Sequence, residues 1–232
     1  MRLAPIRGAR KPEVQMSPLI DIIFLLLIFY AVTTQFVADE RLKLKLPEAK
    51  TAEEGELLYF TGCLPFYDAY FTHLEMDTLN IARDTLRLLN AAGETPVLMA
   101  NELCCGHDLF WSGDEENAAR LAEKNLAAIA ARGAKRVVTS CPECAHTLRE
   151  LYPQLTGKET PFEVLHLSQL LAEKRQAGEL KFSRRGGAVT YHDSCRLARQ
   201  LDVTEAPRET LREVYGDELH EMEHHGKNAV CC

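Results

Sequence analysis

Three short apolar runs in this sequence have the composition of buried β-strands, and each ends a few residues before a cysteine. The runs are Leu57–Phe60, Pro96–Met99 and Arg136–Thr139. After them come a single cysteine, a neighbouring pair and a C-x-x-C motif, which are Cys63, Cys104 with Cys105, and Cys141 with Cys144. Because the carboxyl ends of parallel strands meet at one edge of a sheet, we expect these thiols to lie together.

Helical segments separate the predicted strands. Phe66–Ala92 has a helical repeat of apolar residues that stops before Gly93. A second helix is predicted to begin after Asp114, a residue type that caps helices well, and to end at Gly133. The alternation of strands with helices predicts an α/β fold whose strands are mostly parallel.

The second half of the chain repeats the opening of the first. Ala188–Tyr191 is another predicted strand, and Tyr191–Cys195 aligns with Tyr59–Cys63. A helix is expected over Ala206–Tyr215 and a strand over Glu218–Met222. We therefore expect two related βα units.

The second unit is predicted to be truncated. It contains the neighbouring pair Cys231 and Cys232, but the following glycine and the later C-x-x-C motif of the first unit have no counterpart. We expect the first unit to occupy residues 55–180 and the incomplete start of the second to occupy residues 181–232.

Composition limits the setting in which this chain works. The net charge is −7 and no basic stripe stands out, which argues against a nucleic-acid partner. Five of the eight cysteines are grouped as metal-ligand thiolates are, whereas a secreted disulfide framework would be spread more evenly. No cleavable signal peptide is visible. The thiols therefore suit a reducing compartment.

Two properties of the first five cysteines favour an iron–sulfur cluster. Five thiolates exceed the four that a tetrahedral zinc ion accepts. Neighbouring cysteines such as Cys104 and Cys105 serve one small ion poorly but can bridge or cap different irons of a larger cluster. A zinc site using any four of them, and a thioredoxin-like dithiol at Cys141 and Cys144, are the alternatives. No catalytic nucleophile or acid–base pair stands out.

The segment 16–38 is apolar and long enough to cross about 30 Å of hydrocarbon as a helix. Basic residues flank it evenly, so the positive-inside rule does not set its orientation. Asp21 is the one acidic residue inside this run. Such a carboxylate either serves proton or ion movement, or is stabilised by the helix N-terminus and interfacial water.

The motif M-S-P-L-I-D, the run F-Y-A-V-T-T and the later L-P-E-A lie between Val14 and Glu53, and this segment resembles the ExbD/TolR family. That resemblance implies a proton-driven motor complex with an ExbB/TolQ-like membrane partner, in which Asp21 carries the proton-linked role. Residues 1–54 are accordingly predicted to hold a basic tail, a transmembrane helix and a linker. The family's folded periplasmic domain does not follow the L-P-E-A motif here.

The cysteine pattern resembles the cysteine-rich CCG-domain family. That family includes the B and D subunits of heterodisulfide reductase and the iron–sulfur subunits of glycolate oxidase and anaerobic glycerol-3-phosphate dehydrogenase systems. The matching residues of the first copy are Cys63, Cys104-Cys105-Gly106 and Cys141-Pro142-Glu143-Cys144, and those of the second copy are Tyr191–Arg196 and Cys231-Cys232.

The CCG resemblance implies an oxidoreductase subunit that passes electrons from a flavoprotein dehydrogenase or another redox subunit. The five cysteines of the first copy would ligate a four-iron cluster (4Fe-4S), which is non-cubane in heterodisulfide reductases. Cys195, Cys231 and Cys232 would belong to a second, incomplete cofactor site. The predicted function is a membrane-anchored iron–sulfur electron-transfer subunit; the alternative is an ExbD/TolR-like transport component that uses Asp21.

The two resemblances point to different compartments. ExbD/TolR proteins have their bulk in the periplasm, whereas iron–sulfur clusters are loaded in the cytoplasm and periplasmic thiols tend to oxidise. An inverted anchor, an unfilled cluster site and a mis-joined fusion of two reading frames each resolve this conflict. We expect a single-pass protein of the inner (cytoplasmic) membrane with its cysteine domain in the cytoplasm.

Overall fold

The structure is a computed structural model that describes residues 49–231. The predicted membrane segment 16–38, with Asp21, and the last residue, Cys232, lie outside the described residues. Among residues 49–231, no helix combines the length and the apolar composition that a membrane crossing requires.

Three parallel strands form the central sheet in the order β1-β2-β3. They are β1 (Leu57–Phe60), β2 (Arg136–Thr139) and β3 (Glu163–His166). The bounds of β1 and β2 and the parallel direction confirm the prediction, whereas β3 was not predicted. All four residues of β1 are buried, as in a parallel sheet that is covered on both faces.

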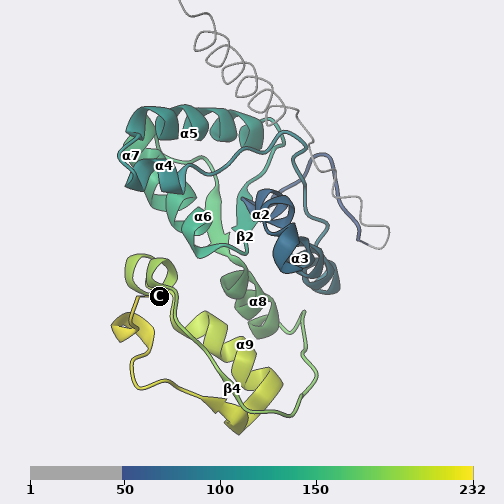
Figure 1. Cartoon of the computed structure of the whole chain (residues 1–232). Helices are drawn as coiled ribbons and strands as arrows, with labels where there is room; N and C mark the ends of the chain where they lie inside the picture. Colours follow the sequence, from purple (N-terminus) through teal and green to yellow (C-terminus); the bar gives the residue numbers. More distant parts are fainter. Residues whose placement is uncertain (1–48, 232) are drawn as a thin grey trace, which may run out of the picture. The chain divides into compact units, whose positions relative to one another are not determined.

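Helices cover the two faces of this sheet (Figure 1). On one face, Leu58 and Val137 pack against Ile129 of α5 (Glu115–Ala130) and Tyr152 of α7 (Tyr152–Thr156). On the other face lie residues of α3 (Leu79–Ala91) and α8 (Leu167–Gln176). The first part of the chain runs from β1 to α8. Its other helical elements are α2 (Leu64–Tyr70), η1 (Thr72–Leu74), α4 (His107–Trp111), α6 (Pro142–His146) and η2 (Thr147–Leu151).

The predicted strand Pro96–Met99 is wrong in its extent. Val97 alone makes parallel bridges, to Leu58 and to Ala52, and no regular strand forms around it. Pro96 has no N–H to donate to a ladder, so pairing cannot extend through it as a donor. Val97 nevertheless lies beside β1, because its N–H donates to the Leu57 carbonyl at 2.8 Å and its carbonyl accepts from Tyr59 at 3.0 Å.

The predicted helix Phe66–Ala92 is interrupted. The chain forms α2 and η1, passes through Glu75 in the left-handed region at φ 54°, and then starts α3. The carboxylate of Asp68 accepts from the N–H of Leu79 at 3.1 Å and so satisfies the first turn of α3. The predicted cap of the next helix is confirmed, since the Asp114 carboxylate accepts from the Asn117 N–H at the start of α5.

The second part of the chain is smaller and contains two short parallel strands. Its elements are β4 (Val189–Thr190), η3 (Arg196–Gln200), α9 (Glu205–Tyr215), η4 (Gly216–Glu218), β5 (Leu219–His220) and η5 (Gly226–Asn228). The two strands are shorter than predicted, and α9 confirms the predicted helix. α9 packs against α8 (Figure 1), and Leu197 and Leu201 pack against Ala145 of α6.

A buried ion network holds the second part together. The Arg208 guanidinium on α9 binds Asp193 through two hydrogen bonds of 2.8 and 2.6 Å, and it also binds Glu221 at 2.7 Å. Asp193 and Arg208 are both almost fully buried. The arginine lowers the pKa of the Asp193 carboxyl, so this aspartate is ionised at neutral pH. The same carboxylate accepts from the N–H of Gly226 at 2.6 Å and ties η5 to the loop after β4.

We predict that Arg208→Met lowers the free energy of unfolding by about 3–5 kcal/mol, because it leaves Asp193 buried without its counter-charge. Arg212→Met on the same helix is the matched control, since Arg212 pairs with Glu205 at the surface and such pairs contribute about 0–1 kcal/mol. Urea denaturation of both variants measures the difference. Equal losses would show that the Asp193–Arg208 pair has no special role.

Candidate metal centre

Each cysteine group of the first part occupies the loop or helix start that follows a sheet segment. Cys63 is the N-cap residue of α2, two loop residues after β1. Cys141 is the N-cap residue of α6, and Pro142 follows it in the first turn, where its fixed φ suits a helix start. Cys104 and Cys105 precede Gly106, which begins α4 in the left-handed region at φ 85°.

These loops bring the five sulfurs of the first part together, and we call Cys63, Cys104, Cys105, Cys141 and Cys144 the thiol site. The Sγ atoms of Cys63 and Cys104 are 3.6 Å apart, and those of Cys105 and Cys144 are 3.4 Å apart. The two neighbouring cysteines therefore contact different loops, because Cys104 contacts Cys63 and Cys105 contacts Cys144. The predicted convergence is confirmed, while the role of these residues as ligands stays a prediction.

The thiol site has a buried side and an exposed side. Cys105 and Cys144 are buried and belong to the hydrophobic core that also contains Phe60 and Leu148. Cys104 is exposed, and Cys63 and Cys141 are half-buried. A group bound by all five sulfurs would therefore be anchored in the core and reachable from solvent.

Backbone N–H groups donate to sulfurs of the thiol site and stabilise their thiolate forms. The Cys104 sulfur accepts from the Gly106 N–H at 3.4 Å, and the Cys141 sulfur accepts from the Cys144 N–H at 3.4 Å. The neighbouring thiols, first Cys105 and then Cys63, lower the pKa of Cys104 further. The contact with the Cys144 thiol lowers the pKa of Cys141, so negative charge gathers first on these two sulfurs.

Glu102 orders the loop that carries Cys63, and sequence reasoning missed it. Its carboxylate accepts from the Thr61 N–H at 3.1 Å, the Thr61 hydroxyl at 2.7 Å and the Gly62 N–H at 2.6 Å. Burial raises the pKa of this carboxyl to about 7. An acidic residue two positions before the cysteine pair was the only signal in the sequence, and its partners lie about forty residues away.

Gly62 provides space for a sulfur. It lies in the left-handed region at φ 67°, and a Cβ built on it would meet the Cys144 Sγ at 2.8 Å. A side chain at this position would therefore push into the place that the Cys144 sulfur occupies. The thiol site depends on a glycine here for both its backbone conformation and its close approach.

The spacing of the sulfurs fits a group larger than one metal ion. A single tetrahedral zinc ion would hold its sulfurs about 3.8 Å from one another. Among the described cysteines, no three sulfurs lie within 4.8 Å of one another. The sulfurs instead form two close pairs, Cys63 with Cys104 and Cys105 with Cys144. The two pairs are linked because Cys104 and Cys105 are adjacent in the sequence, and this arrangement is suited to several irons. The donor set of five thiols, two of them on neighbouring residues, thus fits an iron–sulfur cluster.

Of the three cysteines predicted to form a second cofactor site, the structure describes Cys195 and Cys231. Cys195 is half-buried and precedes η3, Cys231 is exposed, and Cys232 lies outside the described residues. Arg199 donates to the carbonyls of Lys227 and Ala229, and so holds the chain that leads to Cys231. The role of Cys195, Cys231 and Cys232 in a second cofactor site stays a prediction.

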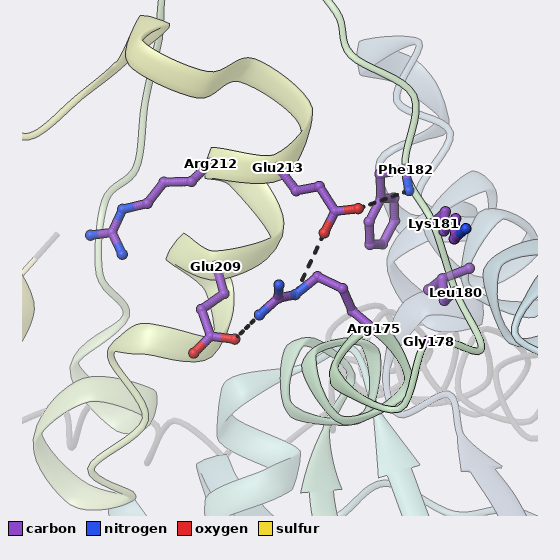
Figure 2. A pocket seen from close by; sticks show the side chains of 8 residues that line it. All are labelled: Arg175, Gly178, Leu180, Lys181, Phe182, Glu209, Arg212 and Glu213. Carbon is purple, nitrogen blue, oxygen red and sulfur yellow. Dashed lines mark hydrogen bonds and ion pairs between the residues drawn. The ribbon is translucent and has the colours of Figure 1, made fainter.

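A wide groove lies between α8 and α9 (Figure 2), but it contains no cysteine. Arg175 crosses it and pairs with Glu209 at 2.5 Å and with Glu213 at 3.5 Å. Leu180 and Phe182 line the rest of this groove. Because no cysteine lines this groove, we do not assign the redox chemistry to it.

The fold and the thiol site define a cysteine-rich α/β protein whose thiols gather at the carboxyl edge of a parallel sheet. The family model described as "Cysteine-rich domain" (CCG) matches residues 57–149 and 189–232. This chain belongs to that cysteine-rich domain family. A second model, described as "Biopolymer transport protein ExbD/TolR", matches residues 9–82. Both resemblances noted in the sequence are thus confirmed.

Several curated relatives resemble most of this chain. The D subunit of the dihydromethanophenazine:CoB–CoM heterodisulfide reductase of Methanosarcina barkeri is 34% identical over 198 residues, which are 83% of this chain and 46% of the relative. The EtfAB:quinone oxidoreductase of Syntrophomonas wolfei is 32% identical over 189 residues, 81% of this chain and 25% of the relative.

A third relative is the B subunit of the fumarate reductase (CoM/CoB) of Methanothermobacter marburgensis. It is 32% identical over 174 residues, which are 75% of this chain and 32% of the relative. The chain therefore spans less than half the length of each of these relatives.

We predict that Gly62→Ala destabilises the protein more than Gly93→Ala and also lowers its capacity to bind iron. Both substitutions place a side chain at positive φ, which costs about 1–2 kcal/mol, but the Cβ at position 93 meets nothing within 4 Å. The measurements are urea denaturation and iron analysis after anaerobic reconstitution. Equal iron contents in the two variants would contradict a role for the Gly62–Cys144 approach.

Proposed function

We propose that this chain is an iron–sulfur electron-transfer subunit of a redox complex. The observation that carries the proposal is the gathering of five thiols from three loops at one edge of the sheet. Its membership in the cysteine-rich domain family and its likeness to a heterodisulfide reductase subunit and an EtfAB:quinone oxidoreductase support the same function.

Cys63, Cys104, Cys105, Cys141 and Cys144 are the ligands we assign to a four-iron cluster. Such a cluster, when bound, accepts and releases electrons one at a time. The chain's own residues hold it in place, and the N–H groups of Gly106 and Cys144 donate to ligand sulfurs. Hydrogen bonds of this kind stabilise the extra negative charge of the reduced state and so raise the reduction potential.

The direction of electron entry follows from burial. Cys105 and Cys144 face the core, whereas Cys104 is exposed and Cys63 is half-buried. Electron exchange with another subunit would therefore occur on the side of Cys63 and Cys104. The partner we assign is a flavoprotein dehydrogenase or another redox subunit, in line with the names of the relatives.

The two-unit organisation is part of this proposal. Residues 55–180 would form the first cysteine-rich unit, and residues 181–232 would begin a second unit whose cofactor site includes Cys195, Cys231 and Cys232. A reducing compartment such as the cytoplasm keeps these thiols available for iron. Attachment to the inner membrane through residues 16–38 would place the unit beside membrane-bound redox partners.

We predict that replacing both Cys104 and Cys105 by serine removes most of the bound iron. This double variant takes one thiolate from each of the two sulfur pairs, so no complete ligand set survives. The full chain, purified and reconstituted without oxygen, is assayed for iron, acid-labile sulfide and visible absorption. Cys195→Ser is the matched control and should retain the iron of the first site.

Two results would contradict the assignment. A folded, colourless wild-type chain without iron would exclude the cluster. A double variant that binds as much iron as the wild type would exclude Cys104 and Cys105 as ligands. Zinc in place of iron in the wild-type sample would favour a structural zinc site instead.

A second candidate function has one specific observation in its favour, the ExbD/TolR match over residues 9–82. In that case Asp21 would serve a proton-coupled transport complex with an ExbB/TolQ-like partner. We predict that Asp21→Asn then abolishes proton-driven transport in cells, while the Cys104 and Cys105 substitutions leave it unchanged. The reverse pattern, loss of redox activity with the cysteine changes only, would contradict the motor function.

A further inference from the structure

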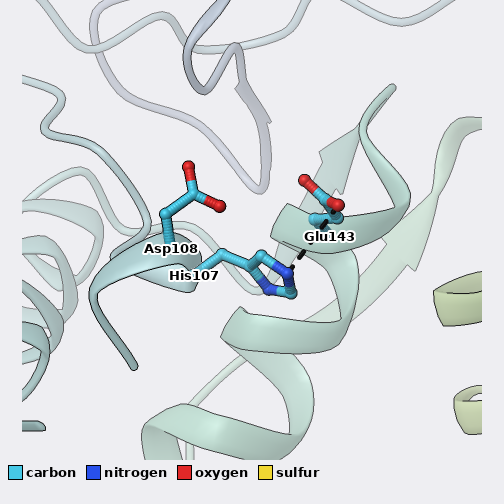
Figure 3. A group of neighbouring side chains, drawn as sticks. All are labelled: His107, Asp108 and Glu143. Carbon is cyan, nitrogen blue, oxygen red and sulfur yellow. Dashed lines mark ion pairs between the residues drawn. The ribbon is translucent and has the colours of Figure 1, made fainter. Parts of the chain in front are cut away.

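Three side chains next to the thiol site, none of them a proposed cluster ligand, approach one another. One ligand atom each from His107, Asp108 and Glu143 lies within 4.8 Å of the other two (Figure 3). The Nε2 atom of His107 is 3.7 Å from a carboxylate oxygen of Glu143. His107 and Asp108 come from the first turn of α4, and Glu143 comes from the first turn of α6.

The histidine is held in one orientation. His107 is 6% exposed, and its Nδ1 atom is 3.1 Å from the Thr147 hydroxyl. That contact leaves Nε2 directed toward the Glu143 carboxylate, as Figure 3 shows. A hydrogen bond to the far nitrogen is the usual way in which proteins orient a metal-binding imidazole.

Within the described residues, the two carboxylates have no lysine or arginine partner. No such side chain in this part of the chain forms an ion pair with Asp108 or Glu143, although their oxygens lie within 4.8 Å of each other. Arg196, whose charge reaches His107, stacks on the Trp111 ring at 4.2 Å instead. Two like charges this close repel, and a bound cation would relieve the repulsion.

We propose that His107, Asp108 and Glu143 form a binding site for a divalent metal ion, separate from the thiol site. One imidazole and two carboxylates suit borderline and hard ions such as Mn²⁺, Fe²⁺ and Zn²⁺. Bonds of about 2.1 Å place such ligand atoms roughly 3 Å apart, so the carboxylates must move inward by about 1 Å. Both are exposed and can rotate to do so.

The position of the site gives it a consequence for function. Glu143 lies between Cys141 and Cys144 in the C-x-x-C motif, so a bound ion would lie beside the sulfurs. Three protein ligands leave coordination positions open. Water or an anionic group of a substrate could occupy them next to the thiol site.

The test is a titration of the full chain, reconstituted with its cluster under anaerobic conditions, with Mn²⁺. Manganese is the probe because soft thiolates compete poorly for it. The six-line EPR signal reports free Mn²⁺, and we expect one Mn²⁺ bound per chain. Asp108→Asn and Glu143→Gln should each weaken this binding by about tenfold or more.

Glu116→Gln is the control, because Glu116 is an exposed acid that pairs with Arg120 on α5. Iron and sulfide analysis of the same samples separates loss of this site from loss of the cluster. If Glu143→Gln also lowers the iron content, its effect on Mn²⁺ binding cannot be separated from loss of the cluster. The test then depends on Asp108→Asn, because Asp108 lies outside the C-x-x-C motif. No binding below millimolar Mn²⁺, or equal binding in Asp108→Asn and Glu116→Gln, would overturn the proposal.

Discussion

The parallel pairing of β1 with β2 is the contact on which the rest of the arrangement depends. Phe60 pairs with Thr139 at the carboxyl ends of the two strands, so the loops carrying Cys63 and Cys141 begin level with each other. Val97 bridges to the other side of β1 and directs the chain toward Cys104 and Cys105. A slip of one residue in this pairing would move a buried side chain of β1 to the opposite face and separate the sulfurs.

The close approach of the cysteine sulfurs at the sheet edge also depends on two residues that contribute no sulfur, Gly62 and Glu102. Gly62 leaves room for the Cys144 sulfur, and Glu102 accepts hydrogen bonds from the N–H groups of Thr61 and Gly62 in the Cys63 loop. Because the buried sulfurs of Cys105 and Cys144 are part of the hydrophobic core, the packing that stabilises the sheet also sets their spacing. The stability of the sheet and the geometry of the thiol site are therefore linked.

The second part of the chain is built against the first at the C-x-x-C helix. Leu197 and Leu201, just after Cys195, pack on Ala145 of α6, and Arg196 stacks on Trp111 of α4. The buried Asp193–Arg208 pair fixes the loop before Cys195 from the other side. The helix that follows Cys195 thus packs against α6 and α4, the helices that follow the cysteines of the first part.

The sequence by itself determined the features that depend on neighbouring residues. The apolar runs of β1 and β2, the cap at Asp114 and the order of the cysteine groups are local patterns, and they were sufficient to predict a parallel sheet with thiols at one edge. Tertiary structure alone decided the break before α3, the reduction of Pro96–Met99 to one bridging residue, the loop acceptor Glu102 and the approach of Glu143 to His107. Each of these depends on contacts between groups far apart in the sequence, whose geometry no local pattern encodes.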